Sequence, residues 1–162
     1  MQISAIPSLS NSTLPKLPKG VKIPNYDRNN LTAGIVHIGL GNFHRAHQSW
    51  YLHRLMQQGQ AHDWAIIGAG VKEFDKAQRL KLLAQDFLTT LVELSPVGRT
   101  VEVVGSMIDY VPIEANNGAL IAQMAKPEIK IVTLTVTEGG YYIDPVSKSF
   151  DSSHPDIVYD AT

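Results

Sequence analysis

The pattern of apolar and polar positions from residue 33 onward predicts strands that alternate with helices. AGIVHI, residues 33–38, and WAIIGAGV, residues 64–71, are short apolar runs rich in β-branched side chains. Such runs are typical of strands that are buried on both faces of a parallel sheet. EIKIVTLTVTE, residues 128–138, gives the longest strand signal in the chain.

Between these strands, apolar residues recur at a spacing that predicts helices. We predict a first helix from Phe43 to Met56, a second over residues 73–85, and a third after Asn116 or Asn117 as N-cap. In the first helix we expect four large side chains in the core, Trp50, Tyr51, Leu55 and Met56. The second helix carries apolar residues on one face, namely Phe74, Ala77, Leu80, Leu83 and Ala84.

Two further strands, residues 87–94 and 100–107, are predicted to form an antiparallel pair around the turn at Pro96 and Gly98. The chain is therefore expected to have an α/β fold, with a parallel sheet, helices on both faces and an inserted antiparallel strand pair. Near the end, a serine N-cap and Pro155 signal a helix that has little room to finish. We therefore expect a truncated chain.

The domain organisation follows from the same pattern. Residues 1–32 are rich in proline, serine, asparagine and lysine, and they predict an extended N-terminal arm. Residues 33–162 form one domain that we expect to be incomplete at its C-terminus.

Composition narrows the classes of function. A formal net charge of −1 provides no general basic field for nucleic acid or anionic lipid. The absence of cysteine excludes disulfides and thiolate metal sites, and no apolar run reaches the roughly 18 residues that span a bilayer. We expect a soluble, cytoplasmic, monomeric protein that binds neither nucleic acid nor membrane.

The stretch GIVHIGLGNFHRAH, residues 34–47, carries the main candidate chemistry. Gly39 and Gly41 follow a predicted strand and precede a predicted helix, as in the dinucleotide-binding fingerprint of Rossmann-like folds. The first glycine permits the tight turn and the second lets backbone approach a pyrophosphate, which the helix N-terminus then attracts. His44 stands where a third glycine is usual, which implies a helix held slightly further from the strand.

A Rossmann-like site also needs an acidic residue after the second strand, to accept hydrogen bonds from the adenosine ribose. Asp75 is our candidate, and Glu73 is the alternative. An acid at this position favours NAD as cofactor. Lys72 and Lys76 flank these acids, so the sequence leaves NADP open.

At GIVHIGLGNFHRAHQSWYLHRLM the sequence resembles the polyol-specific long-chain dehydrogenases, the mannitol 2-dehydrogenase family. DWAIIGAGV, LLAQDFLTTLVEL and EIKIVTLTVTEGGYYID support the same resemblance. It implies a metal-independent, NAD-linked oxidoreductase that interconverts a polyol and its 2-ketose, with mannitol and fructose favoured. Arabinitol, sorbitol and fructuronate are alternative substrates.

The resemblance also assigns roles to residues. It implies that a first group lies near the pyrophosphate, comprising Gly39, Gly41, Asn42, Phe43, His44 and Arg45. It places Asp75 at the ribose, and Thr137 and Glu138 toward the nicotinamide. The family's catalytic residues follow a Lys-x4-Asn-x2-His pattern on a helical substrate domain. None of the nine lysines here has asparagine five positions on, so we expect neither the catalytic residues nor that domain in this chain.

Two readings of the function remain open. The chain is either the cofactor-binding part of such a dehydrogenase or a stand-alone dinucleotide-binding module, a pseudoenzyme without turnover. His44 and His47 resemble a metal-binding pair, but a third ligand is not evident and we expect no metal site. In either case we expect the fragment alone to be inactive.

Overall fold

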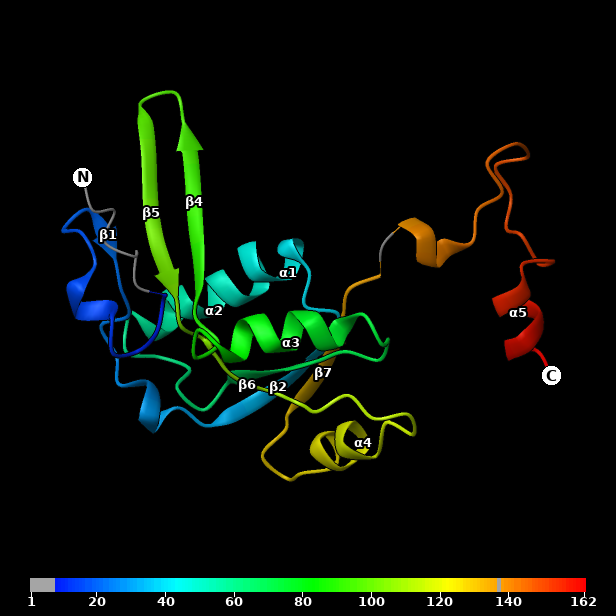
Figure 1. Ribbon diagram of the computed structural model, residues 1–162, viewed down its shortest axis with the longest axis horizontal. Coiled ribbons are helices and arrows are strands. Elements are labelled where there is room, and N and C mark those ends of the chain that lie inside the picture. The colour runs from blue at the N-terminus through cyan, green and yellow to red at the C-terminus, as the bar shows by residue number, and fades with distance from the viewer. Residues whose placement is uncertain (1–7, 137) are drawn as a thin grey trace, which may run out of the picture.

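A four-stranded parallel sheet forms the centre of the computed structural model, which describes residues 8–136 and 138–162 (Figure 1). The strand order is β6-β3-β2-β7, with bounds β2 Ala33–Ile38, β3 Ala65–Ala69, β6 Met107–Tyr110 and β7 Ile131–Leu134. In the middle of the sheet Val36 pairs with Ile67 on one side and with Val132 on the other. The predicted α/β fold with a parallel sheet is confirmed.

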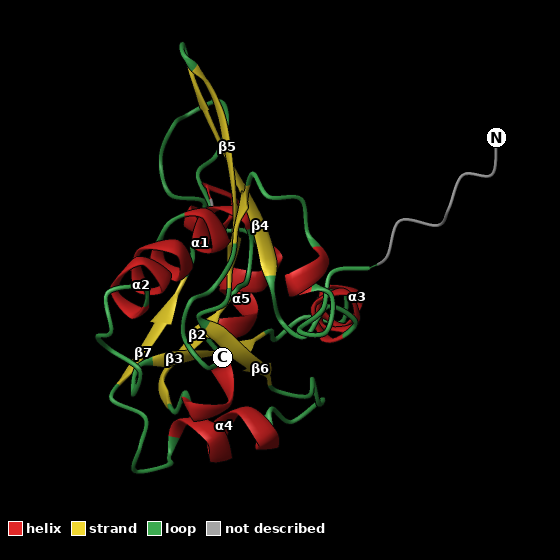
Figure 2. Ribbon diagram, turned by 90° about the vertical axis from the view of Figure 1, so that its left-hand side faces the viewer, coloured by secondary structure: helices red, strands yellow, loops and turns green. Residues whose placement is uncertain are grey.

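Helices cover both faces of this sheet (Figure 2). On one face lie α1 Asn42–Ala46, α2 Gln48–Met56 and α3 Asp75–Leu83, and on the other lies α4 Gly118–Met124. Neighbouring residues of one strand point to opposite faces, so Ile35 packs with Met56 and Leu82, whereas Val36 packs with Leu120. The alternation along buried strands thus supplies two separate hydrophobic cores.

A second, smaller sheet contains the predicted antiparallel pair. β4 Thr89–Ser95 and β5 Gly98–Val104 form a hairpin, and its far end stands out from the body of the molecule (Figure 1). A short strand of the N-terminal arm, β1 Val21–Lys22, pairs in parallel with β5. Two 3-10 turns, η1 Leu14–Lys16 and η2 Arg28–Asn30, complete the arm. The arm is therefore one edge of a sheet as well as an extended segment.

Arg28 fastens the arm to the domain. Its guanidinium donates hydrogen bonds to the carbonyls of Gly105 (2.9 Å), Asp86 (2.8 Å) and Met107 (2.7 Å). Burial of this cation lowers the pKa of Arg28 below its usual value. One side chain thus joins the arm to the end of the hairpin and to the start of β6.

The first predicted helix is broken at His47, which has φ −122° and ψ −87°. The amide of His47 donates to the carbonyl of His44, and its ring Nδ1 donates to the carbonyl of Phe43 at 2.8 Å. Because the axis changes there, α2 buries Met56, while Tyr51 and Leu55 are exposed. The prediction that Tyr51 and Leu55 belong to the core was wrong; Trp50 is half-buried.

Two strand predictions also need correction. The segment 100–107 divides, because β5 ends at Val104 and a strand that the pattern missed, β6, pairs in parallel with β3. β7 has four residues whereas the hairpin strands have seven each, so 128–138 is not the longest strand. β7 stops opposite Ile38, the last residue of β2, since β2 turns away at the next residue.

The remaining helices differ from prediction in detail. The apolar face predicted for α3 is largely exposed, at Phe74, Leu80 and Leu83, and the buried residue is Leu82. α4 begins after Asn117 as predicted. The last helix, α5 Pro155–Asp160, is capped by His154, whose Nδ1 accepts from the amide of Asp156 at 3.2 Å, and not by serine.

The segment after β7 extends away from the body and comprises η3 Glu138–Tyr141 and α5 (Figure 1). Over residues 8–136 and 138–162, no helix combines the length and the apolar character that crossing a bilayer requires.

Gly34 is the position in β2 where a larger residue costs most. A Cβ there would lie 2.6 Å from the carbonyl oxygen of Asp63 and 2.8 Å from the Cα of Trp64, both backbone atoms that cannot swing aside. We expect Gly34→Ala to lower the free energy of unfolding by about 2 kcal/mol, measured by urea denaturation. Gly20→Ala is the control, because nothing lies within 4 Å of its Cβ position; equal stability of the two variants would contradict this packing.

Candidate dinucleotide-binding site

A cavity of about 680 Å³ opens at the carboxyl ends of three parallel strands. Its walls are the turn after β2, the segment after β3, the segment after β7 and one face of α3. The cavity is lined by Ile38, Gly39, Leu40, Gly41, Val71, Lys72, Phe74, Asp75, Ala77, Gln78, Lys81, Leu134, Thr135, Val136 and Gly140. From β2 the chain continues to β3 and β6 on one side, and it then returns to β7 on the other side of β2, so the cavity lies at a topological switch point. Open α/β sheets bind ligands at such points.

Glycine stands at positions 39 and 41 of the turn for two different physical reasons. Gly39 has φ +90°, a conformation that side chains disfavour, and its amide donates to the carbonyl of Ala69 at 3.0 Å. Gly41 has an ordinary φ of −73°, and nothing lies within 4 Å of the position of its Cβ. The fold therefore requires glycine at 39, whereas at 41 the missing side chain leaves open space beside the cavity.

The start of α1 leaves backbone donors unused. No side chain caps this helix, and its first internal hydrogen bond runs from the amide of Arg45 to the carbonyl of Gly41. Among the described residues, the amides of Asn42, Phe43 and His44 have no hydrogen-bond acceptor. Free amides at a helix start provide donors and partial positive charge for an anion.

His44 fills the space between α1 and β2. Its ring is 1% exposed and stacks on the ring of His37, with centroids 3.5 Å apart and planes 17° apart. Neither ring nitrogen of His44 has a partner among the described residues. Burial, then the neighbouring His37 and Arg45, lower its pKa to about 3. The ring thus replaces the close packing of a third glycine, and the ring does not line the cavity.

His37 connects this pair to the wall of the cavity. Its Nδ1 lies 2.7 Å from the hydroxyl of Thr133, and its Nε2 lies 3.1 Å from the hydroxyl of Thr135. Thr133 in turn donates to Gln48 at 3.3 Å. Because the hydroxyl of Thr133 donates its proton to Gln48, it can only accept from His37, so Nδ1 of His37 carries the proton. Nε2 of His37 then accepts a hydrogen bond from the hydroxyl of Thr135. This series of hydrogen bonds fixes the side chain of Thr135, which lines the cavity.

The other residues predicted at the pyrophosphate lie beside the cavity. Asn42 and Arg45 hydrogen-bond to each other and line a neighbouring cavity of about 280 Å³ with Gln85 and Thr89. Phe43 is 66% exposed and stacks on His47, with ring centroids 4.3 Å apart. Of the predicted cofactor residues, the structure brings Gly39, Gly41 and Asp75 to the larger cavity.

Asp75 closes the loop after β3. Its Oδ2 accepts from the amides of Val71 and Lys72, both at 3.0 Å. A Cβ on Gly70 would lie 2.4 Å from that of Asp75, so the carboxyl group packs directly against the strand end. Glu73 instead pairs with Lys76 at 2.9 Å, and neither residue lines the cavity. The acidic residue that reaches the cavity is therefore Asp75.

The nicotinamide end of the predicted site is partly described. Thr137 lies outside the described residues. Glu138 begins η3, which follows the exit of β7, and Gly140 of the same turn lines the cavity. Sequence reasoning missed Thr135, Gln78 and Lys81; the helical spacing of 74, 77, 78 and 81 was the signal that one face of α3 looks onto a common surface.

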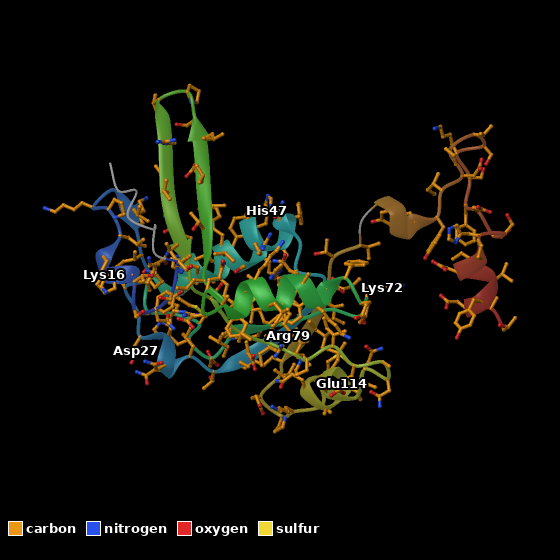
Figure 3. All side chains as sticks on the ribbon, viewed as in Figure 1. Lys16, Asp27, His47, Lys72, Arg79 and Glu114 are labelled. Atoms are coloured by element: carbon orange, nitrogen blue, oxygen red, sulfur yellow. The ribbon has the colours of Figure 1, made fainter. Side chains whose placement is uncertain are left out.

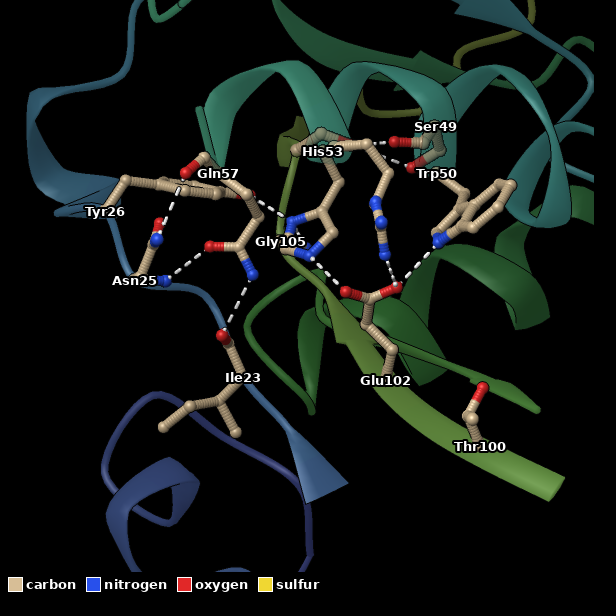
Figure 4. A network of polar contacts seen from close by, with 12 residues as sticks. Ile23, Asn25, Tyr26, Ser49, Trp50, His53, Gln57, Thr100, Glu102 and Gly105 are labelled. Carbon is tan, nitrogen blue, oxygen red and sulfur yellow. Dashed lines mark hydrogen bonds and ion pairs between the residues drawn. The ribbon is translucent and has the colours of Figure 1, made fainter. Parts of the chain in front are cut away.

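A buried polar network supports α2 behind the site (Figure 4). Glu102 of β5 accepts from Trp50 Nε1 at 2.7 Å and lies 3.6 Å from His53 Nε2. Nδ1 of His53 faces the hydroxyl of Tyr26 at 2.6 Å and the amide of Gly105 at 3.4 Å. Burial lowers the pKa of His53 to about 4. The network joins the arm, the hairpin and α2, and α1 connects α2 to the glycine turn.

The described residues contain no group of three histidine, cysteine, aspartate or glutamate side chains arranged for a metal ion. The rings of His44 and His47, which resemble a metal-binding pair in the sequence, lie apart. His44 stacks on His37, whereas His47 stacks on Phe43 and lies toward the outer side of the helices (Figure 3).

Comparison with known proteins points to one family. A family model described as the mannitol dehydrogenase Rossmann domain matches residues 33–161. Mannitol 2-dehydrogenase of Cereibacter sphaeroides is 56% identical over 145 residues, which cover 90% of this chain and 30% of that protein. Mannitol 2-dehydrogenase of Pyricularia oryzae is 44% identical, over 88% of this chain and 28% of that protein.

Two solved structures share the fold. Pseudomonas fluorescens mannitol 2-dehydrogenase, in a ternary complex with NAD and D-mannitol, matches with a TM-score of 0.82 and 43% identity, over 94% of this chain and 31% of that one. A substrate-free D-sorbitol dehydrogenase matches with a TM-score of 0.76 and 37% identity, over 94% and 32%. The chain spans about 30% of the length of the relatives it matches.

The buried histidines make stability depend on pH. His44 and His53 have folded-state pKa values of about 3 and about 4, below the ordinary value of 6.5. The unfolded chain therefore binds protons first as pH falls through 6.5, and stability is lost toward acid. Between pH 7 and pH 5 we expect each of these histidines to lower the free energy of unfolding by about 2 kcal/mol, measured by urea denaturation at both pH values.

His44→Phe keeps a stacking ring and removes one of these titrating groups. The variant should lose about 2 kcal/mol less than the parent between pH 7 and pH 5. An unchanged pH slope in the variant would show that His44 is not buried as a neutral ring.

Proposed function

The chain belongs to the mannitol dehydrogenase family, as its Rossmann domain, and from that premise we propose that its cavity binds NAD. We further propose that it is the cofactor-binding part of an oxidoreductase that interconverts a polyol and its 2-ketose. Mannitol and fructose are the favoured pair, since the relatives from Cereibacter sphaeroides and Pseudomonas fluorescens are mannitol 2-dehydrogenases.

Gly41 is the observation that carries the proposal. Its backbone conformation suits any residue, and no atom of residues 8–136 and 138–162 lies close enough to exclude a side chain. The fold itself does not need glycine here. A glycine beside uncapped amides and an open cavity lets the protein backbone approach the phosphate of a ligand closely. The residues present therefore fit a dinucleotide.

Each predicted residue then has a binding role. The turn from Gly39 to Gly41 and the free amides of Asn42 to His44 hold the pyrophosphate. Arg45 adds a cation near the start of the helix. Asp75 accepts hydrogen bonds from the ribose, with the oxygen that its loop does not use. Thr137 and Glu138 are proposed at the nicotinamide end.

A bound NAD would supply the acceptor for the hydride that leaves the carbinol carbon of the polyol. The residues of this chain bind and orient it; they fix where the acceptor lies relative to the substrate. The Lys-x4-Asn-x2-His pattern expected to move the hydroxyl proton does not occur in these 162 residues. We assign proton transfer to the remaining length of the full enzyme, and we propose that the chain by itself binds cofactor without turnover.

Titration of NADH into the purified chain tests the binding site directly, with nicotinamide fluorescence as the readout. Gly41→Ala should fold with unchanged stability and bind NADH at least about tenfold more weakly, because its Cβ enters the space proposed for the pyrophosphate. Gly20→Ala, which also adds one methyl group in open space, should bind as the parent does.

Two results would count against the proposal. One is a folded parent chain, judged by circular dichroism, that does not bind NADH. The other is a Gly41→Ala variant whose affinity for NADH equals that of the parent.

The ribose role of Asp75 has its own test. Asp75→Ala should weaken the binding of NADH by about tenfold and the binding of NADPH by much less, because only NADH presents a free 2′-hydroxyl to the carboxylate. Equal losses for the two cofactors would limit Asp75 to holding the loop of Val71 and Lys72, a role that its hydrogen bonds already show.

A further inference from the structure

The charged side chains around the 680 Å³ cavity are unevenly distributed. The lining contains two lysines, Lys72 and Lys81, and one acid, Asp75. Lys72 lies just before α3, near the start of the helix (Figure 3), and Lys81 lies on the face of α3 that also carries Phe74, Ala77 and Gln78. Cations therefore outnumber carboxylates at the end of the cavity formed by β3 and α3.

The single acid is partly neutralised by its own loop. Asp75 accepts hydrogen bonds from the amides of Val71 and Lys72 through one oxygen, and it packs against Gly70. Hydrogen bonds from backbone amides stabilise a carboxylate and reduce its effect on other anions. The same bonds fix the loop from which Lys72 projects.

The two lysines have no acidic partner within the described residues, whereas Lys76, on the same segment, pairs with Glu73. None of the ion pairs among the described residues includes Lys72 or Lys81. The charged run at residues 72–76 thus separates into a self-compensated pair outside the cavity and a free cation at its wall.

Cofactor selectivity in Rossmann-like sites is set at this place. An acid at the end of the second strand binds the free ribose hydroxyls, and a cation nearby accommodates a 2′-phosphate. Here β3 is followed by Gly70, Val71 and Lys72, with no acid in direct continuation of the strand. Lysine binds phosphate as a point charge on a flexible stem, which suits two lysines reaching one dianion from different segments.

We propose that the cavity also accepts 2′-phosphorylated cofactor, with Lys72 and Lys81 binding the 2′-phosphate, so that NADPH binds about as tightly as NADH. This inference rests on the proposed function, because it assumes that the adenosine end lies between β3 and α3. It goes further in naming the group that the two unpaired lysines recognise.

The test compares NADH and NADPH on the parent chain and on the double variant Lys72→Gln with Lys81→Gln. We expect the parent to bind both within about threefold, and the double variant to lose about tenfold for NADPH and less than about twofold for NADH. Lys76→Gln is the matched control: it removes the same charge from the same helix, but its partner is Glu73 outside the cavity. It should leave both affinities unchanged.

Adenosine 5′-phosphate and adenosine 2′,5′-bisphosphate, titrated by calorimetry, isolate the 2′-phosphate from the nicotinamide half. The bisphosphate should bind more tightly, and only its affinity should fall in the double variant. NADH binding with NADPH more than about tenfold weaker overturns this inference and leaves the proposed function intact. Equal losses for both cofactors in the double variant also overturn it, and a folded chain that binds neither overturns both proposals.

Discussion

The end of β2 is the constraint on which the rest of this structure depends. β2 lies between β3 and β7, and its last pairing is fixed on both sides, at Ala69 and at Leu134. The next residue, Gly39, must turn at once, and it does so with φ +90° while its amide bonds to the carbonyl of Ala69. That turn places the start of α1 over the carboxyl edge of the sheet. The uncapped amides, the open space beside Gly41 and the position of the cavity all follow from it.

The side chains around the turn adjust the distance between helix and strand. A glycine at position 44 would let α1 pack closely, but the ring of His44 lies in that space and stacks on His37 of β2. His37 also holds Thr133 and Thr135 of the neighbouring strand. The turn is thus supported by a stacked pair of neutral rings, and burial keeps them neutral. The same burial makes this part of the domain sensitive to acid.

The hairpin and the arm stabilise the site from behind. Glu102 of β5 is buried with Trp50 and His53 of α2, and Tyr26 of the arm completes the network (Figure 4). Breaking such a network leaves buried polar groups without partners, which costs more than the loss of one hydrogen bond. Arg28 fixes the arm at the same base of the hairpin, through Gly105, and to Met107 of β6. Segments remote from the cavity therefore hold α2, and through it the glycine turn, in place.

Local pattern alone determined the elements whose signals are local: β2 with its exact bounds, the glycine turn and the hairpin. It also singled out Gly39, Gly41 and Asp75, which the structure brings to the wall of one cavity. Tertiary structure decided what depends on distant partners. The break at His47, the short β6, the early end of β7 and the exposed face of α3 all follow from which surfaces meet, because burial and pairing register are set by neighbours far away in sequence. For the same reason only the fold separates Lys72 and Lys81, which face the cavity, from Lys76, which pairs with Glu73 outside it.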